Sequence, residues 1–292
     1  MNINLNQRVS DNSILFLSLF IIILILSPIL TIFFENINQK SNYFNFFSSS
    51  EFRSYTMNSV VILIGVLLLT LFLGGVSAYL VSFYEFVGVN FFKYSLLMSF
   101  AIPPYIYAYT LSAFFENFGI AYSLVSFFSE DLSKTLIPKI EPLSGSIISL
   151  SLTLFGYVFI LTRSTFLNQS RDLIEVGKSL GFNNIDTFLK IIIPTARPAI
   201  FIGLSLVAME TLSDFGTVSF FGVSTYTTGI YNSWFIFDDL KTANFLSLFL
   251  IFFILFFFGL ESISRKNIKF FNSNISFNKK NKKVTLSGYK GF

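Results

Sequence analysis

Two carboxylates at the end of an apolar stretch have the clearest chemical potential in this sequence. Glu210 and Asp214 follow the uncharged run Ala199–Met209. They are four residues apart, so on a continuous helix they would share one face. If this run crosses a membrane, such costly charges should face a bundle interior or a water-filled cavity. There the pair would either line a substrate path and attract a cation, or serve structure by accepting hydrogen bonds from neighbouring hydroxyls, with Asp214 capping a helix start.

The sequence lacks the residue types on which most side-chain catalysis depends. The sequence has no Cys and no His, which removes disulfides, thiolate nucleophiles, imidazole bases and the two commonest zinc ligands. We therefore expect a protein that is not an enzyme, with no catalytic residue, no metal site and no cofactor of its own. A metal ion handled as cargo would have to meet oxygen ligands.

The composition predicts an all-α polytopic membrane protein with about six transmembrane helices. Hydrophobic residues make up 53% of the 292 residues, charged residues only 12%, and the mean hydropathy is +0.68. A soluble domain carries about 25% charged residues, and a helix needs about 20 apolar residues to cross the hydrocarbon core. The uncharged or apolar runs that meet this need are Ile14–Phe34, Met57–Phe83, Tyr94–Phe115, Leu143–Thr162, Ala199–Met209 and Thr242–Leu260.

The ends of these runs carry further signals. The first run is too long for the apolar core of a signal peptide, so we expect a membrane anchor. Pro103 and Pro104 should kink the third helix. Tyr226, Tyr231 and Trp234 fit an aromatic belt at the membrane interface, or a contact with an external protein.

The basic residues set the orientation. With a cytoplasmic N-terminus, fifteen Lys and Arg residues fall on the cytoplasmic side and five on the other. This bias predicts that both termini are cytoplasmic. Because the basic residues flank apolar segments and form no patch on a soluble face, we expect no nucleic-acid partner.

The long inside loop from Arg163 to Arg197 is patterned. Ser170 is a plausible N-cap for a short helix at Asp172–Leu180, which Gly181 can end in the left-handed conformation. Asn184 can cap a second short helix. The local pattern leaves two interpretations open: a docking element with a glycine hinge, or an amphipathic helix that lies on lipid.

The stretch EVGKSLGFNNIDTFLKIIIP resembles the EAA loop of ABC-transporter permeases. That pattern is Glu-Ala-Ala, three residues, Gly, nine residues, then Ile-x-Leu-Pro. Here Val176 and Gly177 stand for the two alanines and Ile193 for the leucine. The resemblance implies a cytoplasmic coupling-helix loop, whose ATPase-coupling residues would be Glu175, Val176, Gly177, Leu180, Gly181, Ile191 and Pro194.

Two further phrases resemble ferric-iron permeases of this binding-protein-dependent (MetI-like) type: AIPPYIYAYT and METLSDFGTVSFFGVSTYTTGIYNSWF. Thiamine, polyamine and sulfate permeases are similar in the loop but less so in the second phrase. The resemblance implies a first segment at 1–54 with one transmembrane helix, a permease domain at 55–265, and a basic cytoplasmic tail or linker at 266–292. Ferric-iron permeases often fuse two six-helix halves, and this chain resembles the first, either as a separate half or as part of a longer frame.

The resemblance implies a permease subunit of an ABC importer that moves ferric iron across a bacterial inner membrane by alternating access. ATP hydrolysis would occur on a separate cytoplasmic subunit, in agreement with the lack of a GxxxxGK[ST] loop. Further partners would be an external substrate-binding protein, a second permease half (identical, separate or fused) and the lipid bilayer. Alternatives are a thiamine, polyamine or sulfate permease and, in another class, a secondary transporter or channel.

Overall fold

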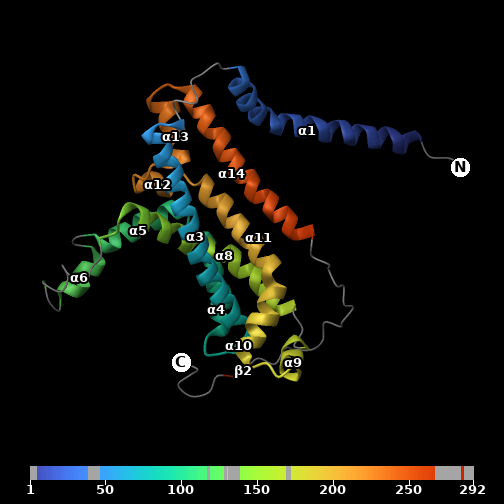
Figure 1. Cartoon of the computed structure of the whole chain (residues 1–292), viewed down its shortest axis with the longest axis vertical. Helices are drawn as coiled ribbons and strands as arrows, with labels where there is room; N and C mark the ends of the chain where they lie inside the picture. The colour runs from blue at the N-terminus through green and yellow to red at the C-terminus, as the bar shows by residue number, and fades with distance from the viewer. Residues whose placement is uncertain are drawn as a thin grey trace.

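The computed structural model describes residues 5–38, 47–116, 119–127, 130, 139–168, 172–266 and 284–285, most of which are helical (Figure 1). Five helices are long and apolar enough to cross a membrane. They are α1 (Leu5–Asn38), α3 (Ser50–Phe83), α8 (Pro142–Asn168), α11 (Ile193–Ser213) and α14 (Leu240–Lys266). Each contains one of the predicted runs, which confirms the all-α polytopic class.

The third predicted run, Tyr94–Phe115, does not form one kinked helix, so that prediction is wrong. Helix α4 (Val89–Ser95) continues into a 3-10 helix, η1 (Leu96–Ala101), and helix α5 (Pro104–Phe115) starts anew after an extended break. Two prolines explain the break. Pro103 disfavours helical geometry at Ile102 before it and lacks an N–H donor, whereas Pro104 suits the first position of a new helix.

Helices α3, α8 and α11 pack side by side and form the core of the bundle (Figure 1). Small residues allow close approach, since a Cβ on Gly74 of α3 would lie 2.8 Å from the carbonyl oxygen of Phe155 in α8. Between these backbones, apolar side chains fill the interior. Side chains with no exposed surface there include those of Val66, Leu150, Val158 and Val207.

Helix α14 packs along α11, and α1 contacts α14 while extending away from the bundle (Figure 1). In the apolar part of α1, Leu15–Glu35, none of the residues is buried. A helix that is apolar on all sides requires an apolar environment around it, and a lipid bilayer or another protein chain supplies one.

The shorter elements lie at the two ends of the bundle. Between α11 and α14 the chain forms α12 (Gly216–Phe220), α13 (Tyr226–Tyr231) and a π-helix, η3 (Asn232–Ile236). At the opposite end lie α9 (Asp172–Ser179) and α10 (Asn184–Thr187), which continues through a π-helix, η2 (Phe188–Ile192), into α11 (Figure 1). The remaining elements are α6 (Ile120–Ser126) and a two-residue parallel pair, β1 (Tyr84–Glu85) with β2 (Val284–Thr285).

Candidate functional site

Helix α9 ends in a Schellman motif at the predicted glycine. Gly181 has a φ of +77°, the left-handed conformation in which glycine carries no steric penalty. Its N–H donates to the carbonyl oxygen of Lys178 at 3.0 Å, and the N–H of Phe182 donates to that of Gly177 at 3.0 Å. The predicted helix end at Gly181 is therefore confirmed, and the chain reverses there into α10.

The cap of the second short helix is one residue earlier than expected. The side-chain oxygen of Asn183 accepts a hydrogen bond from the N–H of Asp186 at 2.6 Å. Asn184 is instead the first residue of α10. The other predicted cap, Ser170, lies outside the described residues. Within α10 and η2, Asp186 pairs with Lys190 at 2.8 Å, one helical turn later.

Gly177 and Thr187 bring α9 and α10 into contact. A Cβ on Gly177 would lie 2.5 Å from Oγ1 and 2.6 Å from Cγ2 of Thr187, which is closer than real Cβ contacts allow. Thr187 is buried, and its hydroxyl donates to the carbonyl oxygen of Asn183 at 2.9 Å. The sequence pattern placed Gly177 in the loop but did not identify Thr187 as its packing partner.

The loop is anchored to the bundle through η2. Ile192 is buried in a cluster that also contains Ala78 and Phe159, and the ring of Phe188 lies 4.3 Å from that of Tyr79. Ile191 and Pro194, singled out by the motif, are half-buried on either side of this anchor. The chain runs from α10 through η2 into α11 without a break.

The same loop exposes an apolar surface, which we call the coupling-loop surface. Glu175 is exposed next to it and makes no ion pair or hydrogen bond with any residue that the structure describes. The surface is formed by four exposed side chains, those of Val176, Leu180, Ile185 and Leu189. Val176 lies on α9, Leu180 in the turn after it, Ile185 on α10 and Leu189 on η2.

The two carboxylates of the candidate path differ in their surroundings. Glu210 is exposed on α11, whereas α11 ends at Ser213 and Asp214 follows in an extended conformation. The Asp214 carboxylate caps α12, accepting from the N–H of Thr217 at 3.0 Å and from that of Val218 at 3.2 Å. Asp214 is the C-cap of α11 and keeps a helical φ of −67°, so it still follows Glu210 by one turn, but its carboxylate is turned to the N–H groups of α12.

The aromatic residues of this region also divide into two groups. Tyr231 and Trp234 are exposed, as an interfacial belt requires. Tyr226 is only 1% exposed, and its hydroxyl lies 2.8 Å from Oγ1 of Thr56 in α3. Tyr226 therefore belongs to the bundle interior and not to the belt, and its own N–H donates to Ser59 of α3 at 3.2 Å. A capping box of Thr225 and Thr228 begins α13 at this point.

Within the described residues, no group of three or more Asp or Glu side chains is arranged to hold a metal ion. Hydroxyl groups gather instead where α11 meets α3 and α13. Ser59, Thr225 and Thr227 belong to this group, and the sequence reasoning did not single them out. The dense Thr pattern from Thr225 to Thr228 was the available signal.

Comparison with known proteins identifies relatives over much of the chain. The chain is 26% identical over 190 residues to an Fe(3+)-transport system permease protein of Haemophilus influenzae, covering 65% of this chain and 33% of that protein. It is also 26% identical over 145 residues to a probable sulfate transport system permease protein of Chlorella vulgaris, covering 50% of this chain and 52% of that protein. The chain thus spans a third to about half of the length of these relatives.

The fold is similar to that of solved transporters. A bacterial ABC transporter involved in the import of the acidic polysaccharide alginate matches with a TM-score of 0.65 and 15% identity, covering 91% of this chain and 99% of that one. The family model described as binding-protein-dependent transport system inner membrane component matches residues 70–269, which include the coupling loop and both candidate path carboxylates. The chain therefore belongs to the family of binding-protein-dependent transport system inner membrane components.

Proposed function

We propose that this chain is the permease subunit of an ABC importer, working by alternating access and driven by ATP hydrolysis on a separate cytoplasmic subunit. The observation that carries the proposal is the coupling loop. Two short helices are held rigidly together at one end of the bundle and continue directly into a membrane-spanning helix. A transport cycle of this type needs such an element, because a motion outside the membrane must reach the spans.

The coupling-loop surface is the proposed docking site of the ATPase subunit. Its four apolar side chains are exposed in the isolated chain, and covering them would be favourable. The Schellman turn at Gly181 and the contact between Gly177 and Thr187 keep the surface in one shape. Anchoring of Ile192 in the bundle interior favours a docking element over a helix that merely lies on lipid.

Ferric iron is the proposed substrate. The relative in Haemophilus influenzae is named as an Fe(3+) permease, and the segment Met209–Phe235 resembles that group. Sulfate is the second candidate, because sulfate permeases are also among the relatives. The exposed carboxylate of Glu210 favours a cation, since a fixed negative charge on the path would repel sulfate.

The remaining assignments follow from this role. The coupling loop and both termini would lie in the cytoplasm of a bacterial cell, with α12 and α13 on the outer side of the inner membrane. There an external substrate-binding protein would deliver the cargo. A second permease half, identical, separate or fused, would complete the path, and Glu210 would face it.

The ATPase contact is tested by co-purification of the complex from membranes. Leu180→Asp places a charge on the coupling-loop surface, and we expect it to reduce recovery of the ATP-binding subunit at least tenfold. Leu180→Met keeps an apolar side chain of similar size and serves as the matched control. If Leu180→Asp recovered as much ATP-binding subunit as Leu180→Met, this surface would not be the docking site.

The substrate is tested by uptake of labelled ferric iron in cells that lack this gene. We expect uptake to be lost and then restored by this chain, alone or with a second permease half. Sulfate uptake is measured in the same cells. Loss of sulfate uptake with normal iron uptake would support the permease function but make sulfate, and not ferric iron, the substrate.

A further inference from the structure

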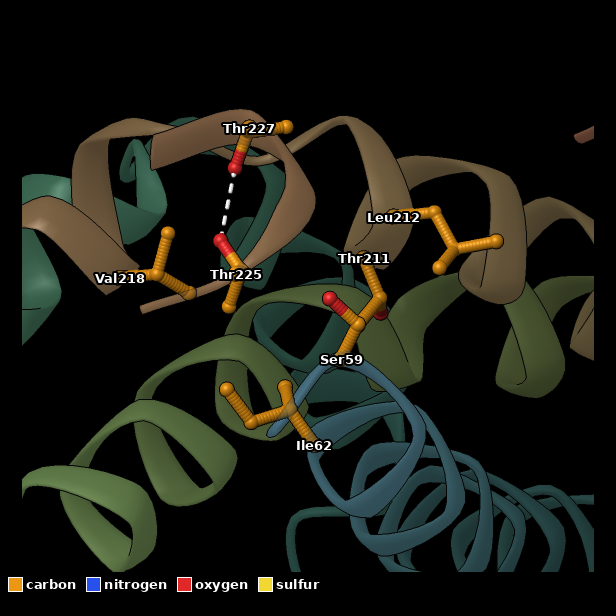
Figure 2. Close-up of a pocket in the computed structure, with 7 residues that line it drawn as sticks. All are labelled: Ser59, Ile62, Thr211, Leu212, Val218, Thr225 and Thr227. Carbon is orange, nitrogen blue, oxygen red and sulfur yellow. Dashed lines mark hydrogen bonds between the residues drawn. The ribbon is translucent and has the colours of Figure 1, made fainter. Parts of the chain in front are cut away.

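A small pocket, lined in part by the apolar side chains of Ile62, Leu212 and Val218, lies where the end of α11 meets α3 and the start of α13 (Figure 2). Four hydroxyl-bearing residues line it, namely Ser59, Thr211, Thr225 and Thr227. The space in which the centre of a water molecule fits is about 10 Å³. One buried water needs about that much space, together with two to four polar partners.

The hydroxyl of Thr211 is buried beside this pocket without a hydrogen-bond partner among the described residues. Thr211 as a whole is only 5% exposed. A threonine inside a helix commonly donates to the carbonyl oxygen four residues earlier, as Thr70 does to Val66 at 2.7 Å. An unsatisfied hydroxyl in a protein interior is costly, so the Thr211 hydroxyl requires a partner in the pocket.

The hydrogen bonds of Thr225 and Thr227 determine which of their protons and lone pairs remain free. Thr227 Oγ1 donates to the carbonyl oxygen of Asp214 at 2.7 Å. In its 3.0 Å contact with Thr225 Oγ1, Thr227 must therefore accept, so Thr225 donates its proton there. Thr225 Oγ1 also accepts from the N–H of Thr228 in the capping box, which leaves it one lone pair. Figure 2 shows this contact as a dashed line above the pocket.

Ser59 completes the set from the opposite helix. Its Oγ accepts from the N–H of Tyr226 at 3.2 Å, and its own proton has no acceptor among the described residues. The pocket thus presents two free hydroxyl protons, on Thr211 and Ser59, and free lone pairs on Thr225 and Thr227.

We propose that one ordered water molecule binds here, accepting from Thr211 and Ser59 and donating to Thr225 Oγ1. Three hydrogen bonds are typical of a buried structural water. A cation fits less well, because the hydroxyl protons of Thr211 and Ser59 would have to turn away with no acceptor. The Asp214 carboxylate, which would balance a cation, is turned toward α12.

This water would connect α3 with two elements that lie about 150 residues later in the sequence, α11 and the N-terminus of α13. Thr211 lies on α11, Ser59 on α3, and Thr225 at the N-terminus of α13. It would therefore hold the segment between α11 and α14 on the bundle and fix the end of the helix that carries Glu210.

The first test is a high-resolution cryo-EM map of the complete transporter in lipid nanodiscs. We expect a density peak within hydrogen-bonding distance of Thr211 Oγ1, Ser59 Oγ and Thr225 Oγ1. A map that resolves other buried waters but has no peak at this position would overturn the proposal, whatever the behaviour of any variant.

The second test is the sign of a change in melting temperature. Thr211→Val exchanges the hydroxyl for a methyl group of similar shape. If water satisfies the hydroxyl, we expect the Tm to fall by about 2–4 °C. If the hydroxyl is unsatisfied, the same change should leave the Tm unaltered or raise it, and that result would overturn the proposal.

Thr153→Val is the matched control. Thr153 is equally buried, but its hydroxyl donates only within its own helix, to the carbonyl oxygens of Ser149 and Leu150. The fall for Thr211→Val should exceed that for Thr153→Val. Exchange of NaCl for choline chloride should not change the Tm of the unaltered protein. If the Tm depended on sodium and Thr211→Val removed this dependence, the pocket would hold a cation and the water proposal would be wrong.

Discussion

Thr187 packs against Gly177 so closely that a Cβ at position 177 would lie 2.5 Å from its Oγ1. The residues belong to different short helices, and their contact sets the angle between α9 and α10. In the EAA pattern this position is an alanine, whereas here a glycine leaves room for Thr187.

Gly177→Ala should therefore damage the coupling loop. Overpacking of a tight contact costs about 1–3 kcal/mol, and we expect reduced recovery of the ATPase subunit and reduced transport. Combining it with Thr187→Ala should restore both in part, because Oγ1 and Cγ2 are removed. Gly75→Ala, at a helical glycine with no atom within 4 Å of an added Cβ, is the control and should be neutral. Absence of rescue in the double variant would argue against the contact.

Substitutions of Gly181 test the backbone conformation of the turn separately from side-chain packing. An added Cβ would have no atom within 4 Å, so any penalty must come from its φ of +77°. We expect Gly181→Val to be the most damaging to ATPase binding and Gly181→Asn to be tolerated best, because Asn adopts the left-handed region more readily. Co-purification of the ATPase subunit measures the order. Equal effects of Val and Asn would indicate that the turn is not required in this form.

Glu210 and Asp214 should respond differently to loss of charge. We expect Glu210→Gln to lower uptake while leaving the amount of protein in the membrane unchanged, because Glu210 is exposed on α11. Asp214→Ala should instead lower the Tm, since it removes the cap of α12, which contributes about 0.5–2 kcal/mol. Uptake and membrane level are measured together for both. Unchanged uptake with Glu210→Gln would exclude that residue from the path.

Asp239 gives a prediction on pH. It precedes α14 and accepts from the N–H of Lys241 at 3.1 Å and from the N–H and hydroxyl of Thr242 at 3.1 and 2.6 Å. Burial raises its pKa, but these hydrogen bonds outweigh burial, and its pKa lies below the ordinary value. Because the pKa is lower in the folded state, the ionised carboxylate stabilises the fold fully at pH values above the unfolded-state pKa of about 3.9. This stabilisation is lost as the pH falls through the folded-state pKa.

Asp239→Ala should accordingly lower the Tm at neutral pH by an amount typical of a lost helix cap. The difference between Asp239→Ala and the unaltered protein should stay constant from pH 7 to 5 and shrink only at more acidic pH. A difference that changed between pH 7 and 5 would assign the effect to another group.

Local features of the chain were predictable because they depend on residues close in the sequence. The long apolar runs became helices α1, α3, α8, α11 and α14, since each segment satisfies its own backbone hydrogen bonds in lipid. The turn at Gly181 was predictable because few residues other than glycine adopt a positive φ. The third run was misread because two adjacent prolines stop a helix and start another, while the composition around them stays uniformly apolar.

Other features depend on partners that the sequence order does not reveal. Tyr226 is buried because Thr56, 170 residues earlier, meets its hydroxyl, whereas Trp234 nearby remains exposed. Asp214 caps α12 because α11 ends one residue before it. Composition alone determined that the chain spans a membrane, and the resemblance of the loop after α8 to the EAA pattern predicted a coupling loop. Only the packing of distant helices decided which polar groups face each other, because a hydrogen bond depends on positions in space and not on distance along the chain.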